Sequence, residues 1–268
     1  MKNRSFLLSA LVITLFSFVS CTKEDSLAAT DNSPIVASVS IDLVNELDVK
    51  MGTEISFEKL TAKQIGKTTT CAVITTESGS NFPKIYTVDF GDGCTTNGIT
   101  RKGKLKITFS NIITETGSTM LIERENYYVN GNKVEGKIEY KNTTVSSNTP
   151  QWTRTVTNGI FTDSKGEVYF NSGTHTVKQT AGVSTPLVLQ DNTYEMIDGN
   201  HTVSKQNGGQ ITLTILETLV KNYSCDYVSK GKIKVESTLL SGTIDYGNGD
   251  CDKDATYTQN GIIFPFTM

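Results

Sequence analysis

Apolar and polar residues alternate along most of this chain, from Thr68 to the C-terminus. The clearest runs are 105–109, 211–215 and 233–235, in which every second side chain is apolar. A period of two places all the apolar side chains of a run on one face, which is typical of half-buried antiparallel strands. The pattern therefore predicts β-structure for most of the chain and excludes a helix bundle.

Tight turns separate the alternating runs. Asn130-Gly131 and Asn260-Gly261 each lie between two apolar runs, and Asn-Gly pairs supply the two positive φ angles of a type I′ hairpin. The segments Asp163–Gly166 and Asn207–Gly209 predict longer hairpin turns. Successive hairpins predict one all-β domain over residues 71–268, an antiparallel hairpin meander that forms a sandwich or a partly closed barrel.

Residues 35–70 precede this domain. Ile41, Val44 and Leu47 recur at a helical spacing, with Leu43 beside them. This spacing predicts a short amphipathic N-terminal helix within residues 35–49. A first strand is the alternative, and residues 51–70 show no clear pattern.

The N-terminus has the layout of an export signal. Lys2 and Arg4 precede an apolar run, 6–16, that is shorter than the about 20 residues needed to span a bilayer. The run ends at Ser20-Cys21, and a small residue directly before a cysteine resembles the lipobox of bacterial lipoproteins. We therefore expect a lipoprotein signal peptide over 1–20, lipidation of Cys21 through a diacylglycerol thioether, and a flexible lipidated tether over 21–34. An ordinary secretory peptide is the alternative.

The segment Lys23-Glu24-Asp25 follows this cysteine. A basic residue and two acidic residues just past a lipid anchor resemble the surface-export signal of Bacteroidota lipoproteins. We expect the protein to be anchored in the outer membrane through the lipid on Cys21 and displayed at the cell surface. The periplasmic face of that membrane is the alternative.

The charge balance limits the partners. The chain of 268 residues has a formal net charge of −3, which becomes −5 when Lys2 and Arg4 leave with the signal peptide. This balance argues against nucleic acid or an anionic lipid surface as the main partner. Charged residues are 20% and hydrophobic residues 37%, which excludes a disordered polyampholyte and a multispan membrane protein.

Four cysteines remain after Cys21. Export places them in an oxidising compartment, so two disulfides with three alternative connectivities are expected. Cys71 with Cys94, and Cys225 with Cys251, each bracket a predicted hairpin whose antiparallel strands bring the two ends together. This is the predicted pairing. A four-cysteine zinc site is the alternative, but the chain lacks Cys-x-x-Cys spacing.

Two passages share a motif, VDFGDGC at 88–94 and IDYGNGDC at 244–251. Together with 98–107, 126–136 and Asn260-Gly261, they resemble a family of uncharacterised surface lipoproteins from Bacteroidota of the flavobacterial type. The resemblance covers most of 71–268 and implies an exported all-β domain without a known active site. The first passage also matches the signature of PKD adhesion domains, but the His-Thr-Tyr stretch that follows there is absent.

No catalytic signature accompanies these features. A nucleophile elbow is absent, and His175 and His201 lie in strand-like polar contexts, where solvent-facing histidines are expected. The segment 250–254 spaces carboxylates as calcium loops do, but Ala255 and Gly261 stand where an EF-hand needs Gly and Glu. An acidic turn is therefore favoured, and we expect no enzyme activity, no metal and no cofactor.

Aromatic residues are frequent in the predicted strands, where they usually form the core or cross-strand pairs. Trp152, beside Arg154, is the first candidate for ligand contact. We expect a non-catalytic binding or adhesion module for an unidentified glycan or protein ligand. A structural or accessory envelope lipoprotein is the alternative, and a hydrolase acting on glycans is less favoured.

Overall fold

The predicted antiparallel meander is confirmed in the computed structural model, which describes residues 31–61, 71–77, 81–186 and 188–268. These residues belong to one unit, Asp31–Met268. The predicted lipidation residue Cys21 and the predicted export segment Lys23-Glu24-Asp25 lie outside the described residues.

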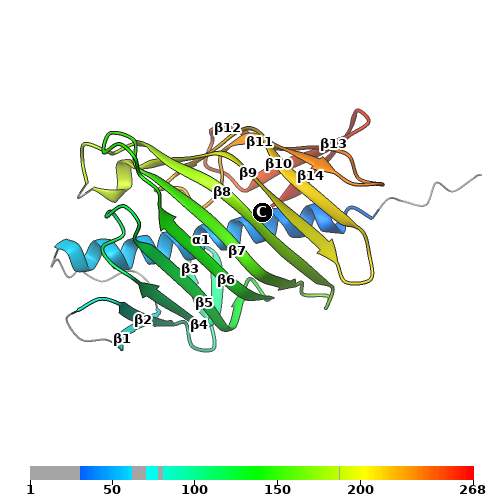
Figure 1. Ribbon diagram of the computed structural model, residues 1–268. Coiled ribbons are helices and arrows are strands. Elements are labelled where there is room, and N and C mark those ends of the chain that lie inside the picture. Colours follow the sequence, from blue (N-terminus) through cyan, green and yellow to red (C-terminus); the bar gives the residue numbers. More distant parts are fainter. Residues whose placement is uncertain (1–30, 62–70, 78–80, 187) are drawn as a thin grey trace, which may run out of the picture. The chain divides into compact units, whose positions relative to one another are not determined.

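In the part of the chain that the structure describes, one long helix precedes fourteen strands (Figure 1). The helix is α1 (Ser33–Thr61), and a 3₁₀ turn, η1 (Leu189–Asp191), separates β8 from β9. The strands are β1 (Val73–Thr76), β2 (Lys84–Asp89), β3 (Cys94–Thr96), β4 (Ile99–Phe109), β5 (Thr119–Val129), β6 (Asn132–Asn142), β7 (Gln151–Thr162), β8 (Val168–Ala181), β9 (Thr193–Lys205), β10 (Gln210–Asn222), β11 (Lys230–Glu236), β12 (Gly242–Asn248), β13 (Asp254–Gln259) and β14 (Ile262–Thr267).

The strands form a single sheet in which neighbours in sequence are neighbours in space. Among the described strands every pairing is antiparallel, and the one departure from sequence order is that β2 and β3 both pair with β4. Strands β1 and β14 are the two edges, so the sheet does not close. Asn130-Gly131 and Asn260-Gly261 have the positive φ angles of the predicted turns, 50° and 83° in the first pair and 52° and 81° in the second.

A row of bulges bends the sheet. Each pairing from β4–β5 to β11–β12 contains at least one register shift, and a β-bulge bends its strand and increases the local twist. Gly103 shows why glycine is needed in this row: its φ is +82°, and a Cβ atom there would lie 2.0 Å from the carbonyl oxygen of Asn126. Aligned bulges therefore curve the sheet around α1.

The helix is the core of the sheet rather than a segment outside it. Between Ile35 and Met51 nearly all side chains are buried or half-buried, with Val36 the exposed one, and they contact strands as distant as β5 and β12. The prediction of a helix near residues 35–49 is confirmed, but the helix begins earlier, at Ser33, and is longer. It is also not amphipathic, because the curved sheet covers most of its surface and polar side chains such as Asp42 and Asp48 find partners inside.

Both predicted disulfides are present. Cys71 joins Cys94, across 23 residues, and Cys225 joins Cys251, across 26 residues. The first bond brackets the β1–β2 hairpin and the second brackets the β11–β12 hairpin, as expected from antiparallel pairing. Among the described residues, no helix is both long and apolar enough to cross a membrane.

Candidate functional site

An aromatic cavity of about 390 Å³ lies beside the C-terminal half of α1. Its aromatic wall comes from three neighbouring parts of the sheet, Tyr140 on β6, Trp152 on β7 and Tyr194 on β9. The Tyr140 and Trp152 rings stack with centroids 5.7 Å apart, and Tyr194 meets Trp152 edge-on at 6.3 Å. We call this space the aromatic cavity; the remaining lining residues are Thr53, Ser56, Phe57, Ile113, Thr114, Glu115, Thr116, Asn142, Thr144, Val145, Ser147, Pro150, Gln179, Gly182, Val183, Pro186, Leu189 and Asn192.

Buried amides hold this wall in place. The Asn142 side chain donates to the carbonyl of Ile113 at 2.9 Å. On the other side, Gln179 donates to the side-chain oxygen of Asn192 at 3.0 Å, and Asn192 donates to the Tyr194 hydroxyl at 3.0 Å. Because these polar groups are satisfied within the wall, the aromatic rings are positioned before any ligand enters.

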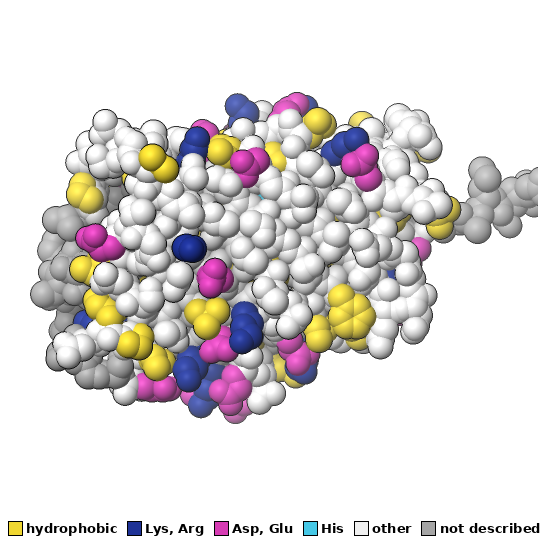
Figure 2. Space-filling model, viewed as in Figure 1, with side chains coloured by type: hydrophobic (Ala, Val, Ile, Leu, Met, Phe, Trp, Pro, Cys, Tyr) yellow, Lys and Arg dark blue, Asp and Glu magenta, His cyan; other side chains and the backbone are white. Residues whose placement is uncertain are grey.

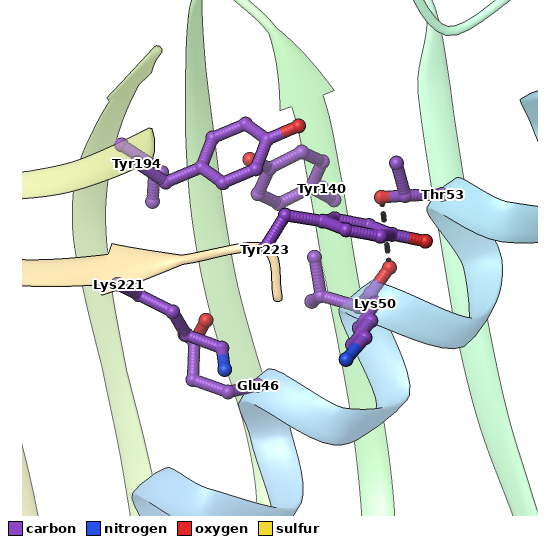
Figure 3. Close-up of a pocket in the computed structure, with 9 residues that line it drawn as sticks. Glu46, Lys50, Thr53, Tyr140, Tyr194, Lys221 and Tyr223 are labelled. Carbon is purple, nitrogen blue, oxygen red and sulfur yellow. Dashed lines mark hydrogen bonds between the residues drawn. The ribbon is translucent and has the colours of Figure 1, made fainter. Parts of the chain in front are cut away.

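A smaller space of about 40 Å³ adjoins the aromatic cavity and shares Thr53, Tyr140 and Tyr194 with it. Its other lining residues are Glu46, Val49, Lys50, Val177, Lys221 and Tyr223. Figure 3 shows that helix α1 supplies Glu46, Lys50 and Thr53, while the aromatic rings and Lys221 come from the strands and the loop opposite. We call this space the lysine pocket.

Lys221 is the most unusual group of the lysine pocket. Its side chain is 4% exposed, and its Nζ donates to the backbone carbonyl of Cys225 at 2.6 Å. Burial lowers the pKa of Lys221 to about 8, so the amine is still largely protonated at neutral pH. Burial also raises the pKa of Tyr194 to about 12, which keeps its phenol neutral.

The second cation of this pocket, Lys50, is paired. Its Nζ lies 2.7 Å from the carboxylate of Asp226 and 5.1 Å from the centre of the Tyr223 ring. The Tyr223 hydroxyl in turn donates to Glu54 at 2.9 Å. Lys50 and Tyr223 are therefore fixed by neighbours on α1 and on the loop after β10.

A buried polar cluster lies farther along the helix, where Asp42 and Glu46 face the sheet. Arg154 forms an ion pair with Glu46 and approaches Asp42 to 4.0 Å. The Tyr246 hydroxyl donates to Asp42 at 3.1 Å, and His201 Nε2 lies 4.0 Å from the same carboxylate. We call Asp42, Glu46, Arg154, His175, His201 and Tyr246 the Asp42 cluster.

Both histidines of the Asp42 cluster are buried, so the expectation that they face solvent is wrong. Their exposed fractions are 4% for His175 and 6% for His201, and their rings are 5.2 Å apart. Burial and the Arg154 charge lower the pKa of His175 to about 2, and burial lowers the pKa of His201. Both rings are therefore neutral at pH 7, and His175 Nδ1 can accept from the Arg154 guanidinium at 3.3 Å.

The sequence contains a signal for this pair that the strand periodicity alone did not reveal. Gly173-Thr174-His175 and Gly199-Asn200-His201 lie on the adjacent strands β8 and β9, and in their register each glycine stands opposite the other histidine. A Cβ atom on Gly173 would lie 2.2 Å from the Cβ of His201. Each glycine makes room for the opposite imidazole, which places both rings inside.

The remaining candidate residues are separated. Trp152 lines the aromatic cavity, whereas Arg154, two residues later on the same face, belongs to the Asp42 cluster. Asp252 accepts from the backbone of Asp254 in an exposed turn, as expected for an acidic turn. Within the described ranges, no three His, Cys, Asp or Glu side chains gather closely enough to hold a metal ion.

The outer surface contrasts with this interior. On the face shown in Figure 2, basic and acidic side chains are interspersed. Many of them pair across neighbouring strands, as Lys104 does with Asp89 at 3.2 Å and Lys232 with Glu217 at 2.9 Å. The specific chemistry of the described residues is therefore concentrated inside, along α1.

The chain matches no protein family, no curated protein and no solved structure.

Proposed function

We propose that this protein is a non-catalytic, lipid-anchored envelope protein that binds a small, largely apolar ligand in the aromatic cavity. The observation that carries the proposal is the cavity itself, with about 390 Å³ of space beside three aromatic rings. Ligand sites for small molecules typically have volumes of about 300–1,000 Å³, apolar walls and a few oriented polar groups. The space suits a small molecule better than a protein epitope.

A binding role agrees with the chemistry of the buried carboxylates. A glycosidase needs two carboxyl groups that reach the scissile bond. Here Glu46 is neutralised by Arg154, and Asp42 accepts from Tyr246 behind the pocket. The aromatic cavity is lined mainly by rings and by amides that already have partners, and its one lining carboxylate, the exposed Glu115, has no second carboxylate opposite it among the lining residues. This lining favours binding over hydrolysis.

The binding proposal is tested with N-phenyl-1-naphthylamine, an uncharged aromatic probe whose fluorescence rises in apolar surroundings. The protein from Thr22 to Met268 contains the whole unit Asp31–Met268 and lacks the lipid. Trp152 is the only tryptophan of the chain and lines the cavity, so energy transfer from Trp152 reports that the probe is bound to the protein, and cavity-filling variants locate it.

The matched variants are Val183→Phe, at a residue that lines the cavity, and Val188→Phe, in the same loop but outside the lining. Val183→Phe fills part of the space and is expected to weaken probe binding about tenfold. Val188→Phe is expected to leave it unchanged. An absence of binding to the wild-type protein, or equal binding by both variants, would overturn the proposal.

We also propose that Cys21 carries the lipid and that Lys23-Glu24-Asp25 directs the protein to the cell surface. The support for both is the order of features in the sequence, namely a basic region, an apolar run, Ser20-Cys21 and an acidic segment. Labelled palmitate should enter the native protein and not the Cys21→Ser variant. External protease on intact cells should degrade the native protein more readily than a variant with three alanines at 23–25. Equal label, or equal digestion, contradicts the corresponding proposal.

A further inference from the structure

The lysine pocket extends the aromatic cavity toward a buried cation. The two spaces share Thr53, Tyr140 and Tyr194, so a ligand in the cavity has the pocket next to it. A space of about 40 Å³ has room for a few water molecules or one small polar group. A polar group at one end of the cavity ligand can therefore enter it.

Lys221 is an ammonium group with donors to spare. Among the described residues its Nζ has a single hydrogen-bond partner, the neutral carbonyl of Cys225, and no carboxylate within ion-pair distance. An ammonium group has three N–H donors. The other cations beside α1 are compensated differently: Lys50 pairs with Asp226, Arg124 with Asp48, and Arg154 with Glu46.

A buried cation whose direct partner is a neutral carbonyl is costly, and an entering anion in direct contact lowers that cost. A buried charge without a counter-ion loses its hydration, whereas a charge-assisted hydrogen bond in an apolar space is stronger than one in water. The walls around Lys221 include Val49, Val177 and three tyrosine rings, so the space is largely apolar. The carboxylates of Glu46 and Asp226 act on Lys221 from a distance and raise its pKa, but each has a closer cation, Arg154 for Glu46 and Lys50 for Asp226.

We propose that the ligand of the aromatic cavity is an amphipathic anion, whose apolar body lies against Tyr140, Trp152 and Tyr194 and whose carboxylate enters the lysine pocket and accepts hydrogen bonds from Lys221. This inference rests on the proposed function, because it assigns the polar end of the same ligand. A space of about 40 Å³ has room for a carboxylate.

The experiment compares 4-phenylbutyrate with 4-phenylbutan-1-ol as competitors of bound N-phenyl-1-naphthylamine at pH 7. The two competitors share a phenylalkyl body and differ in the terminal carboxylate. We expect the carboxylate to displace the probe from the wild-type protein at an at least tenfold lower concentration than the alcohol. Equal potency would overturn the inference and leave the proposed function intact.

Lys221→Met should abolish this preference while the probe still binds, because methionine keeps an unbranched apolar chain and removes the charge. Lys230→Met, at an exposed lysine of the next strand, should keep the preference. Urea unfolding of each variant shows whether it is folded, and Lys221→Gln provides a polar neutral replacement if methionine disturbs the pocket. If the carboxylate is still preferred over the alcohol when residue 221 is uncharged, the inference is wrong. If the probe does not bind the wild-type protein, both the proposed function and the inference are wrong.

Discussion

Replacement of Asp48 by leucine removes the acceptor that joins α1 to β5. The Asp48 carboxylate is 0% exposed and lies 2.8 Å from the Arg124 guanidinium, which is 1% exposed. Its other oxygen accepts from the Tyr127 hydroxyl at 2.7 Å. In Asp48→Leu, a guanidinium charge remains in the core with the side-chain oxygen of Asn45, 2.8 Å away, as its closest acceptor.

The expected cost is large for either single change and smaller than the sum for both. Breaking a buried ion pair from one side costs about 3–5 kcal/mol, whereas its replacement by apolar residues on both sides is often close to neutral. Asp48→Leu and Arg124→Met should therefore each lower the free energy of unfolding by about 3–5 kcal/mol. The double variant leaves the Tyr127 hydroxyl and the Asn45 side-chain oxygen without these partners, at about 1–3 kcal/mol each, so its loss of stability should be smaller than the sum of the two single losses.

Urea titration at pH 7 measures these differences, with Trp152 fluorescence and far-ultraviolet circular dichroism as independent probes of the same transition. The control is the exposed pair Lys234–Glu236, whose side chains are each 52% exposed; replacement of either partner should cost less than about 1 kcal/mol. Additive losses in the Asp48/Arg124 double variant would refute the conclusion that this pair is a coupled buried unit.

Three other measurements test the fold and its interior. Gly103→Ala should be strongly destabilising, whereas Gly131→Ala should be only mildly so. The two glycines have nearly equal φ angles, +82° and +83°, but only a Cβ atom at 103 would meet backbone atoms within 4 Å. Equal urea midpoints for the two variants would contradict the role of the bulge row. His175 and His201 are neutral in the folded protein and have lowered pKa values, so the unfolding free energy should fall as pH decreases below 6.5. For His175, whose pKa falls to about 2, the loss should be on the order of 1–2 kcal/mol down to pH 5. His201→Gln should flatten that pH dependence, and an unchanged slope would refute the assignment. Removal of the Cys225–Cys251 bond by two serines should cost about 3–4 kcal/mol in the chain-entropy model for its 26-residue separation, and an unchanged midpoint would show that the bond does not constrain the unfolded chain.

Local features of the sequence were sufficient for the strands, the turns and the disulfides. Alternation places Leu105 and Ile107 inside regardless of what covers them, and both are fully buried. An Asn-Gly pair favours a tight turn through its own backbone conformation, so the turn depends on only a few neighbouring residues. A hairpin brings its own ends together, so the cysteine pairing could be predicted without knowledge of the rest of the sheet.

The interior of the site depended on contacts between distant segments. An isolated helix would leave Asp42, Glu46 and Asp48 in water, whereas in the folded protein Asp42 and Asp48 are buried and Glu46 pairs with Arg154. Lys221 lies two residues after Leu219 on β10, and both side chains are buried. The alternation alone would predict an apolar residue at position 221. Sequence patterns indicate which side chains share a face, but not which other face will supply their partners.

What the sequence by itself determined was a long antiparallel meander with known turns and two local cross-links, because these follow from interactions between near neighbours. What only the tertiary structure decided was that the sheet bends around α1, that the buried charges and histidines meet there, and that an aromatic cavity beside the helix adjoins the buried amine of Lys221. The physical reason is that curvature accumulates over the bulges of eight strand pairings, from β4–β5 to β11–β12. The small bends of each pairing act together only when the whole sheet has formed.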